Sequence, residues 1–388
     1  MVTISLLFLW LSLIALLHTY LFYPLLVIFL ARKKEGNQLI FEENEFPSVS
    51  IIMAVHNEEK IIAKKIESVI NSDYDKNKIT FFIGSDASTD KTNQIIESYA
   101  KKFPCIVFKN FHNRCGKIHI INELSANSEA PIIVFTDANS LFEMDALRQV
   151  IKHFKNLDVK IVGGRLRNLK TRNNDIALQE HAFMENEFKV KIAEGKLWGT
   201  MMGAYGAFYA VRRDAFSKVP DTFLVDDFYI SLKAIENKGK AICEPMAIAY
   251  EDVSGDLEIE FRRKLRIAAG NFQNLRVFYP LLFSRRFGLA FCFFSHKVLR
   301  WLGPIFLILL FTSAVIVFQQ NYFYTILLIL IMLSWLVPII DYFNRKSRIH
   351  IIILRFITHF YYMNAALLLG LFNFMKGVKS NVWEPTKR

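Results

Sequence analysis

The feature that most limits how this chain can fold is its first hydrophobic segment. Residues 3–31 contain no Asp, Glu, Lys or Arg, and a helix needs only about 20 apolar residues to cross a bilayer. A cleaved signal peptide is the alternative, but no basic residue precedes this segment, it is too long, and no small-residue cleavage site follows. Arg32, Lys33 and Lys34 come directly after it. The positive-inside rule therefore predicts that this end is cytoplasmic and that the N-terminus faces out.

The rest of the composition points to a membrane-associated protein with a globular middle. The chain is 53% hydrophobic with a mean hydropathy of +0.24, and apolar character returns at residue 287 after a mixed stretch. The net charge of +12 suits a surface that meets anionic headgroups and a polyanionic nucleotide. No zinc finger, basic helix or aromatic RNA-binding signature accompanies this charge, which argues against nucleic acid as a partner. The four cysteines show no CxxC spacing and are expected to be reduced thiols.

Short apolar, β-branched runs alternate with helical stretches in the first half of the globular part. Strands are predicted at 49–55, 80–84, 105–109 and 131–136, with helices at 58–70, at 90–101 and after Gly116. This alternation is typical of βαβ units and predicts an α/β domain with a mainly parallel sheet. Ligands of such sheets bind at the carboxyl ends of the strands.

Polar and acidic residues follow three of these strands. They are His56-Asn57-Glu58-Glu59, Ser85 to Asp90, and Asp137-Ala138-Asn139. Helix capping accounts for any one such loop, since Ser88 and Asp90 can serve as N-caps. Three acidic strand ends at one edge favour a nucleotide-sugar site, where carboxylates bind the nucleoside and two oxygen ligands one residue apart hold a hard divalent cation. Asp137 and Asn139 have that spacing.

Residues 49–90 resemble the opening of family 2 glycosyltransferases of the GT-A fold, a Rossmann-like α/β fold. The family's Pro-x-x-Asn-Glu stands here as residues 54–58 and its Asp-Asp-x-Ser-x-Asp as residues 85–90. The resemblance implies that Ala54, Glu58 and Asp86 line the uridine site of a UDP-sugar.

Two further motifs of this family have counterparts. Residues 137–139 are similar to its DxD motif, which implies that Asp137 contacts the donor and that Asp137 and Asn139 bind Mg²⁺ or Mn²⁺. The neutral Asn139 replaces the second acid and lowers the charge of the site. Lys117 matches the family lysine near the nucleotide.

The second half of the globular part resembles the acceptor side of the same family. Residues 203–208, followed by two arginines, are similar to its acceptor segment, which assigns Gly206 and Phe208 to the acceptor. Val225-Asp226-Asp227 stands where the family has Thr-Glu-Asp, so the resemblance implies Asp227 as the base and Asp226 beside it. Removal of the acceptor hydroxyl proton by such a base contributes roughly 10²- to 10⁴-fold. Capping of the helix that follows is the alternative role of these two acids.

Two basic segments near the membrane carry weaker resemblances. Residues 263–267 are similar to the QxxRW motif of polysaccharide synthases with Arg266 retained, which implies bidentate hydrogen bonds from Arg266 to the diphosphate. Snorkelling at a membrane surface is the alternative for this arginine. Residues 383–388 are similar to the gating loop of cellulose-synthase-like enzymes, which implies that Thr386 and Arg388 reach the nucleotide. A basic tail on lipid headgroups is the equal alternative.

The expected organisation follows from these segments. We expect an N-terminal transmembrane helix at 1–31, a linker at 32–47, the cytoplasmic GT-A domain at 48–255, interfacial amphipathic helices at 256–301, two transmembrane helices at 302–340, a third hydrophobic segment at 350–375 and a basic tail at 376–388. If the third segment spans, the basic tail lies outside, against the positive-inside rule. We therefore hypothesise that it is interfacial or re-entrant, a position that Arg355 and His359 on one helix face favour.

The sequence as a whole predicts a multi-pass enzyme of the plasma or inner membrane. It would transfer a sugar from a UDP-sugar, with inversion and with a metal ion, to a growing polysaccharide or a lipid-linked acceptor at the cytoplasmic face. Single transfer to a polyprenyl phosphate or another lipid is the alternative, because the QxxRW motif is altered and few helices span. A transporter or scaffold with a degenerate nucleotide-binding domain is a different class, and the presence of Asp137 and Asp227 argues against it. The sequence identifies neither the sugar, nor the acceptor, nor any export subunit.

Overall fold

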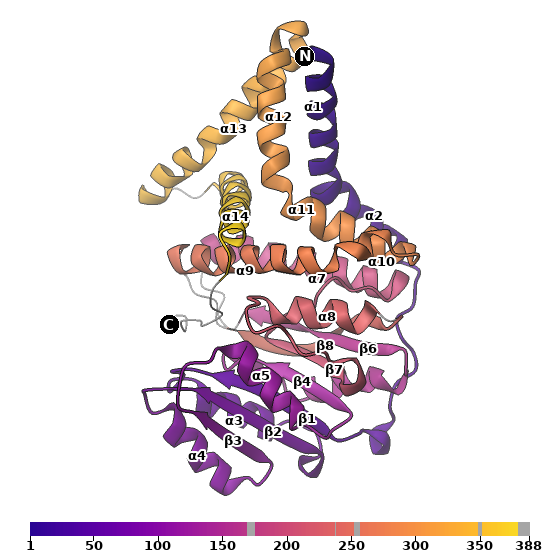
Figure 1. Ribbon diagram of the computed structural model, residues 1–388, viewed down its shortest axis with the longest axis vertical. Coiled ribbons are helices and arrows are strands. Elements are labelled where there is room, and N and C mark those ends of the chain that lie inside the picture. Colours follow the sequence, from indigo (N-terminus) through magenta and orange to yellow (C-terminus); the bar gives the residue numbers. More distant parts are fainter. Residues whose placement is uncertain (169–174, 237, 252–256, 348–350, 379–388) are drawn as a thin grey trace. The chain divides into compact units, whose positions relative to one another are not determined.

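The computed structural model shows two compact units. It describes residues 1–168, 175–236, 238–251, 257–347 and 351–378. One unit is helical and consists of residues 1–29, 172–186 and 255–377, whereas the other carries a β-sheet and consists of residues 30–171, 187–254 and 378–388 (Figure 1).

The sheet has eight strands in the order β3-β2-β1-β4-β7-β6-β8-β5. The strands are β1 (Val49–Val55), β2 (Ile79–Asp86), β3 (Ile106–Phe111), β4 (Ile132–Thr136), β5 (Ser140–Phe142), β6 (Val159–Asn168), β7 (Phe208–Arg212) and β8 (Lys240–Glu251). β3, β2, β1 and β4 pair in parallel, as do β6 and β8. β7 runs antiparallel to both β4 and β6, and β5 runs antiparallel to β8. The predicted parallel half is confirmed, and the reversed strands make the complete sheet mixed.

Helices cover both faces of the parallel half. The odd-numbered side chains of β1 pack in a core with α3 (Ile62–Ile70) and α6 (Ala146–Ile151). On the other face α5 (Lys117–Ala126) comes so close that a Cβ added at Gly84 of β2 would stand 2.3 Å from Ile120 Cγ2. Because neither face meets solvent, β1 is buried at every position and is apolar except at Ser50.

Helices after β1 and β2 begin later than the sequence predicts. The helix expected at 58–70 starts at Ile62, and the one expected at 90–101 is α4 (Thr92–Lys102). The residues before each helix form loops that hydrogen-bond to one another, which keeps them out of the helices. The other long helices of the sheet region are α7 (Asp175–Trp198), whose C-terminal part belongs to this unit, and α8 (Asp226–Glu236).

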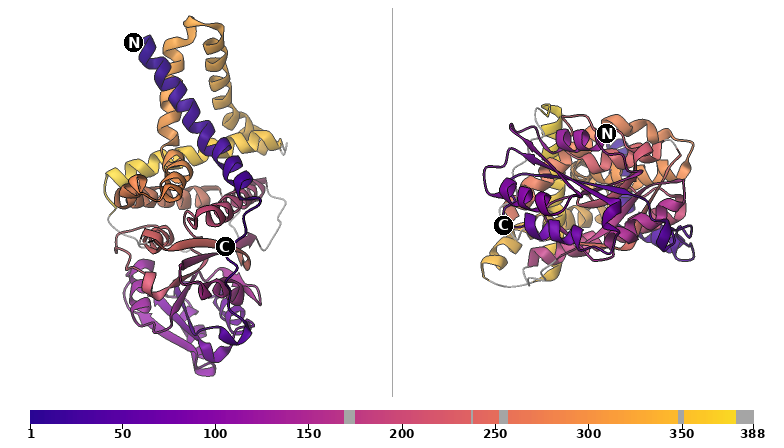
Figure 2. Two further views of the ribbon diagram at one scale, coloured as in Figure 1. Left: turned by 90° about the vertical axis from the view of Figure 1, so that its right-hand side faces the viewer. Right: turned by 90° about the horizontal axis from the view of Figure 1, so that it is seen from below.

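The helical unit contains the membrane-spanning candidates. Its helices are α1 (Val2–Leu17), α2 (Tyr23–Ala31), α9 (Leu257–Phe278), α10 (Phe287–Cys292), α11 (Leu299–Trp301), α12 (Gly303–Val317), α13 (Tyr322–Lys346) and α14 (Ile352–Met375). Within the described residues, four stretches are long and apolar enough to cross a membrane: Val2–Ala31, Gly303–Gln320, Tyr322–Asn344 and Ile352–Met375. α1 and α12 run side by side (Figures 1 and 2) and bury Leu9, Leu16, Leu310 and Ala314 between them.

A buried ion pair joins α13 and α14. Arg355 Nε lies 3.2 Å from Asp341 Oδ1, and the two side chains are only 3% and 1% exposed. Charged residues inside apolar helical bundles are tolerated when they pair with one another. This partner for Arg355 is not evident from the sequence, and it makes the arginine compatible with a spanning helix as well as with an interfacial one.

Candidate active site

The loops after β1 and β2 are tied together into one rim. The backbone N–H of Asn57 donates to Ser88 Oγ at 3.1 Å. Asp90 accepts hydrogen bonds from the backbone N–H groups of Glu59 at 3.1 Å and of Thr92 at 3.0 Å. Asn57 has a φ of 53°, a left-handed conformation in which asparagine is common. The N-cap of α4 is Lys91 and not Asp90 as predicted, and the Asp90 carboxylate instead joins the start of α4 to the neighbouring loop.

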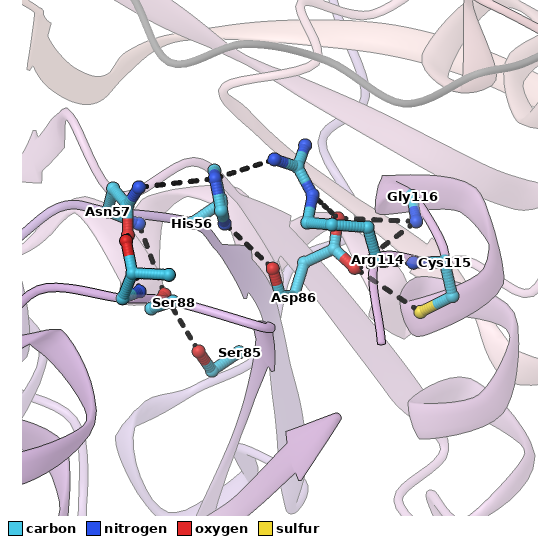
Figure 3. A network of polar contacts seen from close by, with 9 residues as sticks. His56, Asn57, Ser85, Asp86, Ser88, Arg114, Cys115 and Gly116 are labelled. Carbon is cyan, nitrogen blue, oxygen red and sulfur yellow. Dashed lines mark hydrogen bonds and ion pairs between the residues drawn. The ribbon is translucent and has the colours of Figure 1, made fainter. Parts of the chain in front are cut away.

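Asp86 ends β2 and its carboxylate is occupied by the segment 114–116 (Figure 3). The carboxylate is fully buried. It accepts hydrogen bonds from Arg114 Nε at 3.0 Å, from the Cys115 N–H at 2.7 Å and from the Gly116 N–H at 3.2 Å. In the structure the Asp86 carboxylate holds the loop that leads into α5, and its place in the uridine site stays a prediction.

His56 connects Asp86 and Arg114 from the other side (Figure 3). Its Nδ1 lies 2.7 Å from the backbone oxygen of Asp86, and its Nε2 lies 2.6 Å from Arg114 Nη1. A guanidinium can only donate, so Nε2 accepts and Nδ1 carries the proton. Burial lowers the pKa of His56, which agrees with this neutral tautomer.

Two other predicted nucleoside contacts lie close to these loops. Ala54 pairs with Gly84 of β2 and is 8% exposed. Glu58 follows β1 with a partly exposed side chain, and its backbone N–H donates to Thr92 Oγ1 at 2.8 Å. Of the acids at this rim, Glu58 is more open to a ligand than Asp86.

Lys117 bridges two acids that are far apart in the sequence. It is the first residue of α5, and its Nζ lies 3.0 Å from Asp137 Oδ1 and 3.6 Å from Asp226 Oδ2. Burial disfavours the charged lysine, but Asp137 and Asp226 outweigh burial and raise the pKa of Lys117 above its ordinary value. Asp137 follows β4 and Asp226 begins α8, so the ammonium joins the predicted donor side to the predicted acceptor side.

Asp227 lies in the first turn of α8, and its carboxylate has fewer hydrogen bonds in the structure than that of Asp86. Its Oδ1 accepts a hydrogen bond from the Phe228 N–H at 2.7 Å, and a Cβ added at Gly206 would stand 2.8 Å from its Oδ2. Burial and then the repulsion of Asp226 raise the pKa of Asp227 to about 6, although Lys117 opposes the shift. A carboxyl group with a pKa near neutrality is suited to accept a proton at physiological pH.

Phe208, predicted on the acceptor side, is buried. It is 0% exposed, its ring centre lies 4.4 Å from that of Phe142, and a Cβ added at Gly164 would stand 2.3 Å from its Cδ1. Successive side chains of a strand point to opposite faces, so Phe208 turns into the core while Tyr209 stacks on Phe135 at 5.1 Å. Phe208 is thus buried in the core in this structure, and its assignment to the acceptor side stays a prediction.

The two residues predicted as metal ligands offer oxygen atoms. Asn139 Nδ2 donates to Glu251 Oε1 at 2.6 Å, which leaves Asn139 Oδ1 and the Asp137 carboxylate as oxygen ligands. No group of three or more His, Cys, Asp or Glu side chains in the described part of the chain could hold a metal ion. Mg²⁺ is usually bound by only one or two carboxylates together with substrate phosphates. The donor set therefore fits a divalent cation that binds together with a diphosphate.

Three other residues are predicted to contact the nucleotide. Arg266 is on α9 of the helical unit with an exposed side chain. Thr386 and Arg388 lie outside the described residues. Their contacts with a nucleotide stay predictions.

Two residues of this region are not evident from the motifs. Arg114, which pairs with Asp86, precedes the Gly116-Lys117 match by only two residues, but nothing in its local pattern names a partner. Lys65 is fully buried on α3. Its spacing from the buried Ile62 and Val69 places it on the apolar stripe of that helix, and this signal could have identified it.

Comparison with known proteins adds relatives to this geometry. Residues 50–219 match the model of glycosyl transferase family 2. The beta-monoglucosyldiacylglycerol synthase of Synechocystis sp. is 24% identical over 270 residues, which cover 67% of this chain and 55% of that protein. The poly-beta-1,6-N-acetyl-D-glucosamine synthase of Staphylococcus epidermidis is 23% identical over 328 residues, which cover 79% of this chain and 77% of that protein. This chain therefore spans about half the length of the first relative and about three quarters of the second.

A solved structure shares the fold over nearly the whole chain. The mannosyltransferase PcManGT of Pyrobaculum calidifontis, in complex with GDP-Man and Mn²⁺, has a TM-score of 0.68 and 20% sequence identity, covering 94% of this chain and 98% of that one. At this identity the likeness shows the fold alone. Residues 50–219 are therefore a glycosyl transferase family 2 domain, the chain shares the GT-A fold, and four of its described stretches are long and apolar enough to cross a membrane.

Proposed function

We propose that this enzyme transfers a hexose with inversion from a UDP-sugar to a growing polysaccharide or a lipid-linked acceptor, at the cytoplasmic face of the cell membrane. The position of Asp227 carries the proposal. Its carboxyl group has a pKa of about 6 and lies against Gly206. The charge of Lys117 lowers this pKa, and Lys117 in turn contacts Asp137. Inverting transfer needs such a base beside cations that stabilise a leaving diphosphate.

The proposed reaction uses the two sides of this cluster together. Asp227 accepts the proton of the acceptor hydroxyl while the hydroxyl oxygen forms a bond to the anomeric carbon of the sugar. The bond from that carbon to the diphosphate oxygen breaks, and UDP leaves with the electron pair, so the configuration inverts. Lys117, paired with Asp137 in the structure, is the cation available to the diphosphate. A Mg²⁺ or Mn²⁺ ion held by Asp137 and Asn139 would neutralise charge on the leaving group.

The nucleoside contacts are proposed with different roles. Glu58 and Ala54 would line the uridine site directly, since Glu58 is partly exposed at the rim. Asp86 would support the uridine site by holding the loop of residues 114–116, because its carboxylate accepts hydrogen bonds from Arg114 and from the N–H groups of residues 115 and 116. Arg266, Thr386 and Arg388 would contact the diphosphate.

Orientation and acceptor are supported by separate observations. The basic residues Arg32, Lys33 and Lys34 after the first candidate span favour a cytoplasmic catalytic domain. Similarity to a poly-N-acetylglucosamine synthase supports a polymer as product. Similarity to a monoglucosyldiacylglycerol synthase supports single transfer to a lipid as the second candidate.

The test uses the purified full-length protein in lipid nanodiscs. It is incubated with a panel of UDP-sugars, with GDP-mannose for comparison, in Mg²⁺, in Mn²⁺ or in EDTA, and nucleotide release is measured. We expect UDP release from one donor and none in EDTA. Release of GDP alone would replace the proposed donor class, and no release from any donor, with native lipids and oligosaccharides supplied, would overturn the proposal. Mass analysis of the product distinguishes a single added sugar from a polymer ladder.

A further inference from the structure

Lys65 is a buried lysine beneath the Asp137–Asn139 loop. It lies on α3 and is 0% exposed, whereas its neighbour Lys64 on the same helix is exposed. Burial lowers the pKa of Lys65 well below its ordinary value, and the charge of Asp137 opposes this shift. Burying an ammonium group is costly unless its N–H groups find acceptors. The contacts of Lys65 therefore decide what it does.

Those contacts lie at both ends of the loop. Lys65 Nζ donates to Thr136 Oγ1 at 2.8 Å and to the backbone oxygen of Ser140, and it stands 3.6 Å from the centre of the Phe142 ring. Thr136 directly precedes residues 137–139, and Ser140 directly follows them. Two hydrogen bonds and one aromatic face account for the three N–H groups of an ammonium. One side chain thus fastens the loop where it leaves the sheet and where it returns to it.

Thr136 extends this contact toward the acceptor side. Its Oγ1 donates to the backbone oxygen of Ala207 at 3.0 Å. A hydroxyl has a single proton, so Thr136 Oγ1 accepts a hydrogen bond from Lys65 and donates its own proton to Ala207. Ala207 follows Gly206, the residue whose Cα lies against Asp227. The hydrogen bonds from Lys65 therefore connect the loop of Asp137 and Asn139 with the segment beside Asp227.

We propose that Lys65 is a positioning residue that holds the Asp137–Asn139 loop in the geometry that binds the donor's divalent cation, and that through Thr136 it fixes this loop relative to Gly206. This inference rests on the proposed function, because it requires a cation bound with a nucleotide at Asp137. If Lys65 only filled the core, its substitution by an apolar side chain would leave Mn²⁺ binding unchanged. An apolar side chain of similar length would occupy the same space and remove the cost of a buried charge.

The experiment compares full-length Lys65→Met with wild type and with Lys64→Met, the same substitution one residue away on the exposed face. Three quantities are measured: the Tm, the Kd of Mn²⁺ in saturating UDP by electron paramagnetic resonance, and kcat and KM for the donor. GDP replaces UDP if wild type prefers it. For Lys65→Met we expect a Tm equal to or above that of wild type. We also expect Mn²⁺ binding to be weakened about tenfold and kcat/KM to be lowered about 10- to 100-fold, since a displacement of about 1 Å can cost about 10²-fold. Lys64→Met should match wild type throughout.

A second pair of variants keeps the inference testable if Lys65→Met does not fold. Thr136→Val removes the hydroxyl at nearly constant shape and should also weaken Mn²⁺ binding. Thr136→Ser keeps the hydroxyl and should bind Mn²⁺ as tightly as wild type. Wild-type Mn²⁺ affinity in folded Lys65→Met, or in Thr136→Val, would overturn the positioning role while leaving the proposed function intact. A wild-type protein that binds neither UDP nor GDP with Mn²⁺ would overturn the proposed function and this inference with it.

Discussion

Asp86 and Asp227 are two acids of the same domain with opposite surroundings. Asp86 is fully buried and accepts hydrogen bonds from a guanidinium and from two backbone N–H groups. Asp227 accepts one backbone hydrogen bond, from Phe228, and faces the like charge of Asp226. Its negative charge is opposed mainly by Lys117, which already contacts two other carboxylates. The first acid is neutralised by its own loop and the second is not.

This difference separates an acid that stabilises structure from one that can react. Hydrogen bonds to a carboxylate favour its charged form, whereas burial and a neighbouring acid disfavour it. Asp227 therefore ionises at a free-energy cost that a proton from a substrate can relieve, and such shifts gather at functional sites. The Asp86 carboxylate holds residues 114–116 against the rim by three hydrogen bonds.

Among the substitutions that test this difference between the two acids, the largest effect is expected at Asp227. Asp227→Asn should lower kcat by about 10²- to 10⁴-fold, because the amide cannot accept the acceptor's proton, while UDP binding persists. The pKa of this acid is raised in the folded state from 3.8 to about 6, so its contribution to stability is present below pH 3.8 and lost as the pH rises through about 6. The variant should therefore match wild type in Tm near pH 4 and equal or exceed it at pH 8.

Nucleotide release and thermal unfolding at both pH values check this expectation. Asp214→Asn is the matched control, since Asp214 is a surface acid 67% exposed in its side chain and should change neither quantity. Wild-type turnover in Asp227→Asn would remove the base from this position.

The opposite outcome is expected at Asp86. Asp86→Asn leaves the charge of Arg114 without its carboxylate, and breaking such a pair costs about 3–5 kcal/mol when it is fully buried. Arg114 is 30% exposed in its side chain, so we expect a smaller loss that lowers the Tm by about 5–10 °C. Thermal unfolding of the full chain measures it. The double variant with Arg114→Gln should recover part of the loss, and a Tm unchanged in Asp86→Asn would show that this network contributes no stability.

Local patterns predicted much of this architecture because they are set by neighbouring residues. The parallel strands, the polar residues after them and the acids in the first turn of α8 all follow from short-range periodicity. The contact of Lys117 with Asp226 does not, because it depends on β7 pairing beside β4 and on where the chain then places α8. The burial of Phe208 was not predicted for a similar reason. Gly206 and Phe208 are two residues apart, and only the pairing of β7 shows that one lies beside Asp227 while the other enters the core.

Asp86 shows a second limit of sequence motifs. A motif states which residue type stands at a position, and it cannot state whether the carboxylate is already hydrogen-bonded. Arg114 and Cys115 decide that for Asp86, although neither belongs to the motif. Lys65 is the converse case, because its place on an apolar helix face was visible in the sequence while its acceptors, Thr136 and Ser140, depend on how β4 and β5 lie against α3.

An intermediate effect is expected where the backbone touches the proposed base. In Gly206→Ala the new Cβ would stand 2.8 Å from Asp227 Oδ2, so the carboxylate must shift. We expect kcat/KM to fall about tenfold to 100-fold, since about 1 Å of misplacement can cost about 10²-fold, with little change in Tm. Gly36→Ala is the control because a Cβ there meets nothing within 4 Å. Equal loss of activity and of Tm in Gly206→Ala would mean that this glycine serves folding and not the position of Asp227.

The smallest effect is expected from pH, and it compares the two acids without a change at either. With a pKa of about 6, only about one tenth of Asp227 is ionised at pH 5, so kcat at pH 5 should be about tenfold below its value at pH 8. Asp226 raises this pKa after burial itself, while Lys117, the Phe228 N–H and Lys191 lower it. Asp226→Asn should accordingly move the acidic limb of the profile to lower pH. Recovery of activity when the pH is returned to 8 excludes unfolding as the cause. A profile that stays flat from pH 5 to pH 8 would mean that the ionisation of Asp227 does not control kcat in this range, and the surroundings of Asp227 would no longer explain why it reacts.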